Sequence, residues 1–351
     1  VKQQLYIFLL QKREENELQS LLTVGNTRLI QKPTGSGSPI SPNKMMILLV
    51  ALILGFGIPF AVFYVLKLMD NTVKSRNDLV RLSVPFLAEI PQLGIEGNFL
   101  QKLRANKFDE THTRILVQSG KRDMINEAFR VLRTNLDLMM NSNKDDSKVI
   151  MLTSFNPNAG KTFTILNLAA SMALKNSKVL LLDLDLRKAT LSKALNMNAT
   201  GVASYLNGKD NDIFGHIKPI TENLDILPVG SLPPNPAELL VSDKFKDMVK
   251  SLRDNYDYIF LDCPPLDVVA DTSIISSSAD ITIFILRAGL FDKRGLQTVE
   301  DIYQSERFSR MAMILNGVEA YHRGYGHGYG YGYGYGYGYG YGYGSTGDEK
   351  E

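Results

Sequence analysis

Residues Met45–Leu66 form an unbroken run without a charged side chain, and this run limits what the chain can fold into. Its 22 residues would make a helix of about 33 Å, which matches the hydrocarbon core of a bilayer. A helix of this length in a soluble protein carries polar residues on one face, and a cleaved signal peptide is shorter. The sequence therefore predicts a transmembrane helix over residues 45–66.

Basic residues flank this run unequally. Lys44 lies before it, and four basic residues follow it: Lys67, Lys74, Arg76 and Arg81. Because short flanks rich in Lys and Arg stay in the cytoplasm, we expect the chain after the run to be cytoplasmic and the chain before it to be periplasmic.

The rest of the chain divides by composition. Residues 1–32 begin with apolar side chains near helical spacing, and we expect them to be the end of a periplasmic helical arm. Residues 33–44 hold too many prolines and glycines for a helix or strand, which predicts a connector. We expect a cytoplasmic juxtamembrane linker over residues 67–110, a folded domain over 111–320 and a disordered tail over 321–351.

Charge and cysteine content exclude two classes of protein. Lys and Arg number 39 against 37 Asp and Glu, a formal net charge of +2, so we expect no nucleic-acid partner. The single cysteine, Cys263, excludes an intramolecular disulfide framework, and we expect it to be a packed residue rather than a nucleophile. His322 and His327 have no acidic or thiol neighbour nearby, so we expect no metal site there.

An alternation of strand and helix patterns begins at Lys148. An amphipathic helix is predicted over residues 123–140, and short β-branched or Leu-rich runs then alternate with helical stretches as far as Gly317. This pattern predicts an α/β fold with a mostly parallel sheet that is covered by helices on both faces. Ligands of such sheets bind beyond the carboxyl ends of the strands.

The first of these carboxyl ends carries the sequence SFNPNAGKT, residues 154–162. It follows an apolar strand and opens a helix, which is the setting of a phosphate-binding loop (P-loop). Lys161 would reach the β- and γ-phosphates of ATP and Thr162 would hold Mg²⁺. The predicted nucleotide-binding residues are Asn158, Ala159, Gly160, Lys161, Thr162 and Phe163. Phe155 stands where the motif begins with glycine, and Asn158 can adopt the positive φ that such a loop needs.

Two more strands end in acidic residues. The sequence KVLLLDLDLR places Asp183 and Asp185 on one side of a strand end, and IFLDCPP places Asp262 at the end of another. Carboxylates beside a triphosphate can hold Mg²⁺ and accept a proton. We therefore predict one site in which three acids and Lys161 share one edge of the sheet.

Together these motifs resemble the bacterial tyrosine kinases of capsule and exopolysaccharide export. That family has a P-loop, a DxDxR motif after an apolar strand, and a Walker B strand that ends in Asp, a small residue and two prolines. The matching residues here are 154–162, 183–187 and 262–265. The stretch 233–240, the preceding transmembrane helix and the terminal tyrosines extend the resemblance over most of the chain.

The resemblance implies a P-loop tyrosine kinase domain over residues 111–320, which uses ATP and Mg²⁺. Lys161 would neutralise the phosphates. Asp183 would orient or deprotonate the acceptor hydroxyl, and Asp185 would assist the metal. Thr162 and Asp262 would organise Mg²⁺. Phosphoryl transfer depends mostly on positioning and charge stabilisation, so this set is sufficient in kind.

The resemblance also implies partners at the inner membrane. The family's E-x-x-R-x-x-R helix matches Glu127, Arg130 and Arg133, which would assemble a homo-oligomeric ring. From the residues alone, these side chains form a solvated face with an ion pair worth about 0.2–0.5 kcal/mol. The other implied partners are the lipid bilayer, the polysaccharide polymerisation and export machinery, and a cognate tyrosine phosphatase.

The tail is the most unusual segment, because ten of the 16 tyrosines lie between Tyr321 and Tyr343. Alternating glycines make ordering costly, which predicts disorder, although such repeats can also self-associate. A flexible span of roughly 25 Å would let the tail reach a neighbour's active site, so we expect phosphorylation in trans. Each phosphate would add about 1.5 to 2 negative charges and loosen the ring. The predicted acceptors are Tyr325, Tyr329, Tyr331, Tyr333, Tyr335, Tyr337, Tyr339, Tyr341 and Tyr343.

Two other functions stay open from the sequence. A partition-type ATPase shares the predicted sheet, but it usually carries an extra lysine early in the P-loop, where this chain has Phe155 and Asn156, and it lacks a tyrosine tail. A non-enzymatic regulator of polysaccharide chain length would have a decayed nucleotide site, against which the retained lysine and acids argue.

Overall fold

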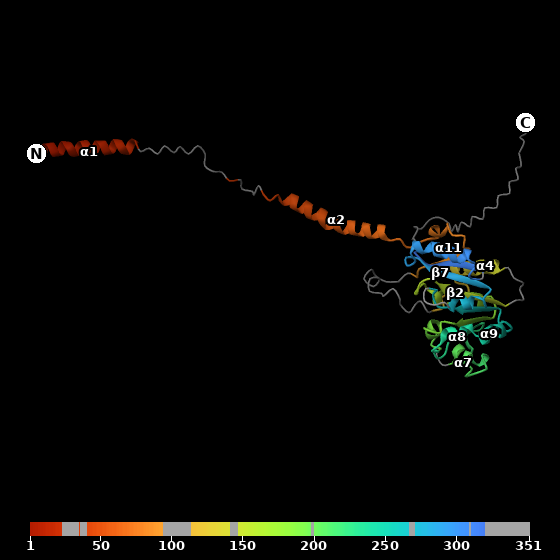
Figure 1. The fold of residues 1–351 in the computed structure, drawn as a ribbon. Helices are drawn as coiled ribbons and strands as arrows, with labels where there is room; N and C mark the ends of the chain where they lie inside the picture. The colour runs from red at the N-terminus through yellow and green to blue at the C-terminus, as the bar shows by residue number, and fades with distance from the viewer. Residues whose placement is uncertain are drawn as a thin grey trace, which may run out of the picture. The chain divides into compact units, whose positions relative to one another are not determined.

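The computed structural model describes residues 1–22, 35, 41–93, 114–140, 147–197, 200–266, 271–308 and 310–319. The chain separates into two compact units, residues 1–70 and residues 71–351. Each unit is described by itself, with the elements labelled as in Figure 1.

The first unit contains two helices, α1 (Lys2–Leu22) and α2 (Lys44–Met69). Asn43 caps α2, since its side-chain oxygen accepts a hydrogen bond from the backbone N–H of Met45 at 3.1 Å. The side chains of both helices are exposed throughout. Within the described part of the chain, α2 alone is long and apolar enough to cross a membrane, and it contains the whole predicted span 45–66.

The second unit is built on one eight-stranded sheet with the order β1-β8-β7-β2-β6-β3-β5-β4. Its strands are β1 (Phe86–Pro91), β2 (Lys148–Ser154), β3 (Val179–Asp183), β4 (Lys218–Thr221), β5 (Leu224–Leu227), β6 (Tyr258–Asp262), β7 (Ile281–Arg287) and β8 (Met311–Val318). The strand pairs are parallel except for β4 and β5, which are antiparallel. The prediction of a mostly parallel α/β sheet is therefore confirmed.

Helices cover both faces of the sheet. The longer ones are α4 (Met124–Met140), α5 (Lys161–Ala173), α9 (Asp243–Arg253) and α11 (Leu296–Gln304). The shorter ones are η1 (Arg76–Leu79), α6 (Thr190–Ala194), α7 (Val202–Leu206), η3 (Phe214–His216), α8 (Pro236–Val241), α10 (Asp271–Ser276) and η4 (Lys293–Gly295).

Strand β2 shows how the two faces are filled. Ile150 and Leu152 join the apolar cluster that contains α4 and α5, whereas Val149 and Met151 join the cluster that contains α9 and α11. Because side chains alternate along a strand, every second residue enters each cluster. Both faces of the central strands are therefore buried, as a parallel sheet requires.

The structure differs from the sequence prediction in the expected linker, residues 67–110. Phe86–Pro91 forms β1, which pairs with β8 at one edge of the sheet. Upstream of it, Val73 is fully buried, and its N–H donates to the carbonyl of Phe291 at 2.8 Å. Asp78 forms an ion pair of 2.7 Å with Lys293. The segment that follows α2 is thus part of the folded domain, because strand β8 offers it hydrogen-bond partners that lie far away in sequence.

Candidate active site

The loop between β2 and α5 has the backbone of a phosphate-binding loop. Two of its residues have positive φ, Asn158 at 61° and Gly160 at 87°. Gly160 is the cap residue of α5, so the helix begins at Lys161 with its first N–H groups at the loop. The Lys161 amine donates to the Ser154 hydroxyl at 3.3 Å. The expectation that Asn158 takes positive φ is confirmed.

Phe155, which departs from the sequence motif, anchors the loop to the apolar core. Its side chain is buried, and its ring centroid lies 5.3 Å from that of Phe284 on β7 and 5.4 Å from that of Phe291. The aromatic side chain therefore fills the apolar core where the motif usually has a glycine. Sequence reasoning missed this role because both partners come about 130 positions later.

We expect the variant Phe155→Leu to lose about 1–3 kcal/mol of unfolding free energy, because two aromatic pairs of about 0.5–1.5 kcal/mol each disappear. Chemical denaturation of the two proteins measures the difference. Phe214→Leu is the matched control, since Phe214 begins the short helix η3 and is 45% exposed. An unfolding free energy of Phe155→Leu equal to that of the control would contradict the anchoring role.

Strand β8 also contacts the loop, through a side-chain hydrogen bond. The Asn316 amide, buried at the carboxyl end of β8, donates to the carbonyl of Ala159 at 2.8 Å. A Cβ added to Gly160 would lie only 2.1 Å from this amide nitrogen. Any other residue at position 160 would have to displace this amide and adopt a left-handed φ. No motif in the sequence pointed to Asn316.

The three predicted acids come together at one edge of the sheet. Asp183 of β3 and Asp262 of β6 are register partners on neighbouring strands, and Asp185 follows Asp183 directly beyond the strand. One oxygen of Asp183 accepts hydrogen bonds from the hydroxyl and the N–H of Ser192, at 2.6 and 2.8 Å. Its other oxygen accepts the N–H of Asp185 at 3.1 Å. Ser192, which the sequence did not single out, therefore fixes the direction of this carboxylate.

Burial sets the electrostatics of this edge. It raises the pKa of Asp183 to about 6, against the hydrogen bonds from Ser192, and raises the pKa of Asp262 well above its usual range. It also lowers the pKa of Lys161, while the charges of Asp262 and Asp185 act in the opposite direction. Charged groups withdrawn from water in this way need a partner of opposite charge. Because the site has three acids and Lys161, a bound cation would balance the remaining negative charge.

The donor set fits a magnesium nucleotide. Oδ1 of Asp262 is buried and has no hydrogen-bond partner among the described residues, and the hydroxyl of Thr162 lies on the first turn of α5. Hard oxygen donors of this kind suit Mg²⁺. Within the same described residues, no three His, Cys, Asp or Glu side chains form a metal cluster. Mg²⁺ does not need one, because it commonly keeps water and phosphate oxygens as ligands.

Helix α4 carries the three residues that were expected to contact other subunits. Glu127 and Arg130 form an ion pair on its surface, and the Arg130 side chain is exposed. Arg133 instead points inward, where it donates to the carbonyl oxygen of Ser171 on α5 at 2.6 Å. Glu127 and Arg130 are thus placed on the helix surface, whereas Arg133 ties α4 to α5.

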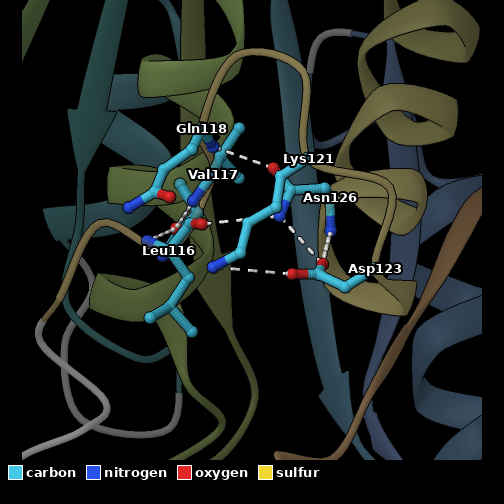
Figure 2. Close-up of polar contacts among 7 residues, drawn as sticks. Leu116, Val117, Gln118, Lys121, Asp123 and Asn126 are labelled. Atoms are coloured by element: carbon cyan, nitrogen blue, oxygen red, sulfur yellow. Dashed lines mark hydrogen bonds and ion pairs between the residues drawn. The ribbon is translucent and has the colours of Figure 1, made fainter.

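A polar cluster fixes the start of α4 (Figure 2). The Asn126 side chain accepts the N–H of Gln118 and donates to Asp123, both at 2.8 Å. Asn167 of α5, fully buried, accepts the N–H of Leu116 at 2.7 Å. Helix α4 is therefore held against the helix that begins at the P-loop.

Two other sequence predictions have simple outcomes. Cys263 is fully buried in the core, and burial raises the pKa of its thiol, as expected for a packed residue. The nine predicted phosphoacceptor tyrosines, with His322 and His327, lie outside the described residues.

Comparisons with known proteins match both parts of the chain. A family model described as "AAA domain" matches residues 147–310, and one described as "G-rich domain on putative tyrosine kinase" matches residues 1–68. The chain is 30% identical over 327 residues to "Tyrosine-protein kinase wzc" of Salmonella typhimurium, with 92% of this chain and 45% of that protein covered. The kinase domain of Escherichia coli tyrosine kinase ETK matches with a TM-score of 0.60 and 28% identity, over 74% of this chain and all of that structure. Over most of its length, the chain is therefore similar to bacterial tyrosine kinases.

Another curated bacterial tyrosine kinase, "Tyrosine-protein kinase etk" of Escherichia coli, is 28% identical over 322 residues. The chain spans less than half of the length of these curated relatives, 45% and 44%. The "BceF Tyrosine Kinase Domain" structure matches with a TM-score of 0.57 and 25% identity. The matches indicate a nucleotide-binding domain, and the G-rich domain together with α2 indicates an inner-membrane protein.

Proposed function

We propose that this chain is the membrane-anchored kinase portion of a protein-tyrosine autokinase. It transfers the γ-phosphate of ATP to tyrosines of the C-terminal tail, in trans between the subunits of a ring. The observation that carries this proposal is the meeting of Lys161 with Asp183, Asp185 and Asp262 at one sheet edge, in a chain that also contains a run of tyrosines at residues 321–343.

The residues of this edge have distinct roles in the proposed transfer. Lys161 and the N–H groups at the start of α5 bind the phosphates, because helix N-termini attract anions. Asp183 orients or deprotonates the acceptor hydroxyl, and Ser192 keeps its carboxylate in one direction. When bound, Mg²⁺ would neutralise charge on the transferring phosphoryl group, and Thr162, Asp185 and Asp262 are the residues that would hold it.

The membrane and the tail give this activity its regulation. We infer that α2 crosses the inner membrane with the kinase domain and tail on the cytoplasmic side, because four basic residues follow the apolar run. Glu127 and Arg130 lie on the surface of α4 and would contact a neighbouring subunit. Phosphates that accumulate on the tails would repel one another and loosen the ring. The polysaccharide polymerisation and export machinery and a tyrosine phosphatase are the partners that this proposal implies.

A mixing experiment tests transfer between subunits. A Lys161→Met chain that keeps its tail is incubated with an active chain that lacks all residues after Gly324, in the presence of labelled ATP and Mg²⁺. We expect labelled phosphotyrosine on the longer, inactive chain, because the only tyrosine tail belongs to it.

The control is the Lys161→Met chain alone, which we expect to stay unlabelled. A full-length active chain is incubated separately under the same conditions. If that chain is labelled but the Lys161→Met chain in the mixture is not, transfer in trans is refuted and transfer within one chain remains. No label on either would refute the kinase function and favour a non-enzymatic regulator of chain length.

A further inference from the structure

Arg287 is a partly buried arginine that has no side-chain partner among the described residues. It is the last residue of β7, which lies beside β2 in the sheet (Figure 1). Burial lowers the pKa of its guanidinium, and within the described residues no carboxylate or other side chain forms an ion pair or hydrogen bond with it. A cation that is partly withdrawn from water without a partner is suited to an anionic ligand.

The P-loop and the end of β8 both lie close to this guanidinium. A Cβ built on Gly160 would lie 3.4 Å from Nη1 of Arg287, and one built on Gly317 would lie 3.2 Å from both its Cζ and its Nε. Gly317 has a φ of 76°, and it follows Asn316, the residue that holds Ala159. The planar group of Arg287 is therefore seated against two glycines, and one of them caps the phosphate-binding helix.

The sheet order tells which end of a nucleotide Arg287 would meet. Strand β2 leads into the P-loop, with β6 on one side and β7 on the other. The acids Asp262 and Asp183 lie on the β6 side, with the charges that act on Lys161, and that side holds the reacting γ-phosphate in the proposed function. Arg287 and Asn316 lie on the β7 and β8 side, where the opposite end of the bound nucleotide would lie.

We propose that Arg287 is a nucleotide-positioning residue that binds the nucleoside end of ATP, at the α-phosphate and the attached adenosine. The inference rests on the proposed function of the same site. An arginine suits this place because its fixed fork matches a phosphate and its planar face can lie against a base. Its contact is the same in ATP and ADP, so it contributes to binding but not to the chemical step.

Equilibrium titration of full-length protein with ATP and with ADP, beside steady-state phosphorylation rates, tests this assignment. We expect Arg287→Ala to raise Kd for both nucleotides by the same factor, about 10- to 100-fold, while kcat at saturating ATP stays within about threefold. Arg287→Lys keeps the charge without the fork, so we expect it to recover part of the affinity. Arg307→Ala is the matched control, since this exposed arginine precedes the amino end of β8, away from the carboxyl ends of the strands where the P-loop lies. We expect it to leave Kd for both nucleotides unchanged.

Three results would overturn the proposal. One is an unchanged Kd for both nucleotides, another is weaker binding of ATP alone, which would place Arg287 at the γ-phosphate, and the third is a lower kcat with unchanged Kd. If Arg287→Ala does not fold, Arg287→Lys and Arg287→Gln give the same comparison. Because nucleotide binding is measured separately from tyrosine phosphorylation, loss of the kinase function alone leaves this inference standing.

Discussion

Replacement of Lys161 by methionine is expected to lower the rate of tail phosphorylation by on the order of 10²–10³-fold, the cost of removing one positioned donor at a developing charge. Methionine keeps the length of the side chain but removes the cation whose charge acts on the buried carboxylate of Asp262. Initial rates of phosphotyrosine formation with labelled ATP and Mg²⁺ measure the effect.

Lys175→Met is the matched control for this experiment. Lys175 follows the same helix, but it is half exposed and pairs with Asp137 at 3.2 Å on the surface, where such pairs contribute only about 0–1 kcal/mol. We expect its rate to equal that of the wild type. A Lys161→Met rate within tenfold of the wild type would rule out the role assigned to this lysine.

Replacement of Gly160 by alanine is the second large effect that we expect. The left-handed φ of 87° costs an alanine about 1–2 kcal/mol. The added Cβ would also force the Asn316 amide away from Ala159, and a buried group left without its partner costs about 1–3 kcal/mol. We therefore expect ATP to bind about 30- to 4,000-fold more weakly, as measured by equilibrium titration.

Two further variants separate conformational strain from steric conflict. Gly120 lies outside the P-loop, has a φ of 77° and has no atom within 4 Å of a built Cβ. Gly120→Ala therefore places the same backbone strain away from the nucleotide site, and we expect it to leave ATP affinity unchanged. The double variant Gly160→Ala with Asn316→Ala removes the clash, and we expect it to bind ATP more tightly than Gly160→Ala. If it binds no better, Asn316 is not what excludes a side chain at position 160.

Local patterns were sufficient to predict the sheet and the acidic side of the site. Apolar strands that end in Asp183 and Asp262 are visible in the sequence, and parallel strands bring their carboxyl ends to one rim. The P-loop was found in the same way, since Gly160 and Lys161 sit between a strand and a helix.

The other side of the site could not be predicted, because it depends on contacts between residues far apart in the chain. Asn316 and Arg287 belong to no motif, and they reach the loop only because β7 and β8 lie beside β2. Strand β1 was missed for a similar reason. Its sequence lies between Pro85 and Pro91 and reads as a turn-forming linker until β8 is there to pair with it.

The two edge strands matter for a chain that carries an aromatic repeat able to self-associate. Strand β1 ends in Pro91, and the four-residue strand β4 contains Pro219; each proline removes one N–H from an outer ladder. Short edges interrupted by proline are poor templates for an added strand. Within the described sheet, the kinase domain therefore offers little backbone for the tyrosine and glycine repeat to pair with. Under the proposed function, such edges would let the tail serve as substrate without starting fibrous growth on the sheet of the kinase itself.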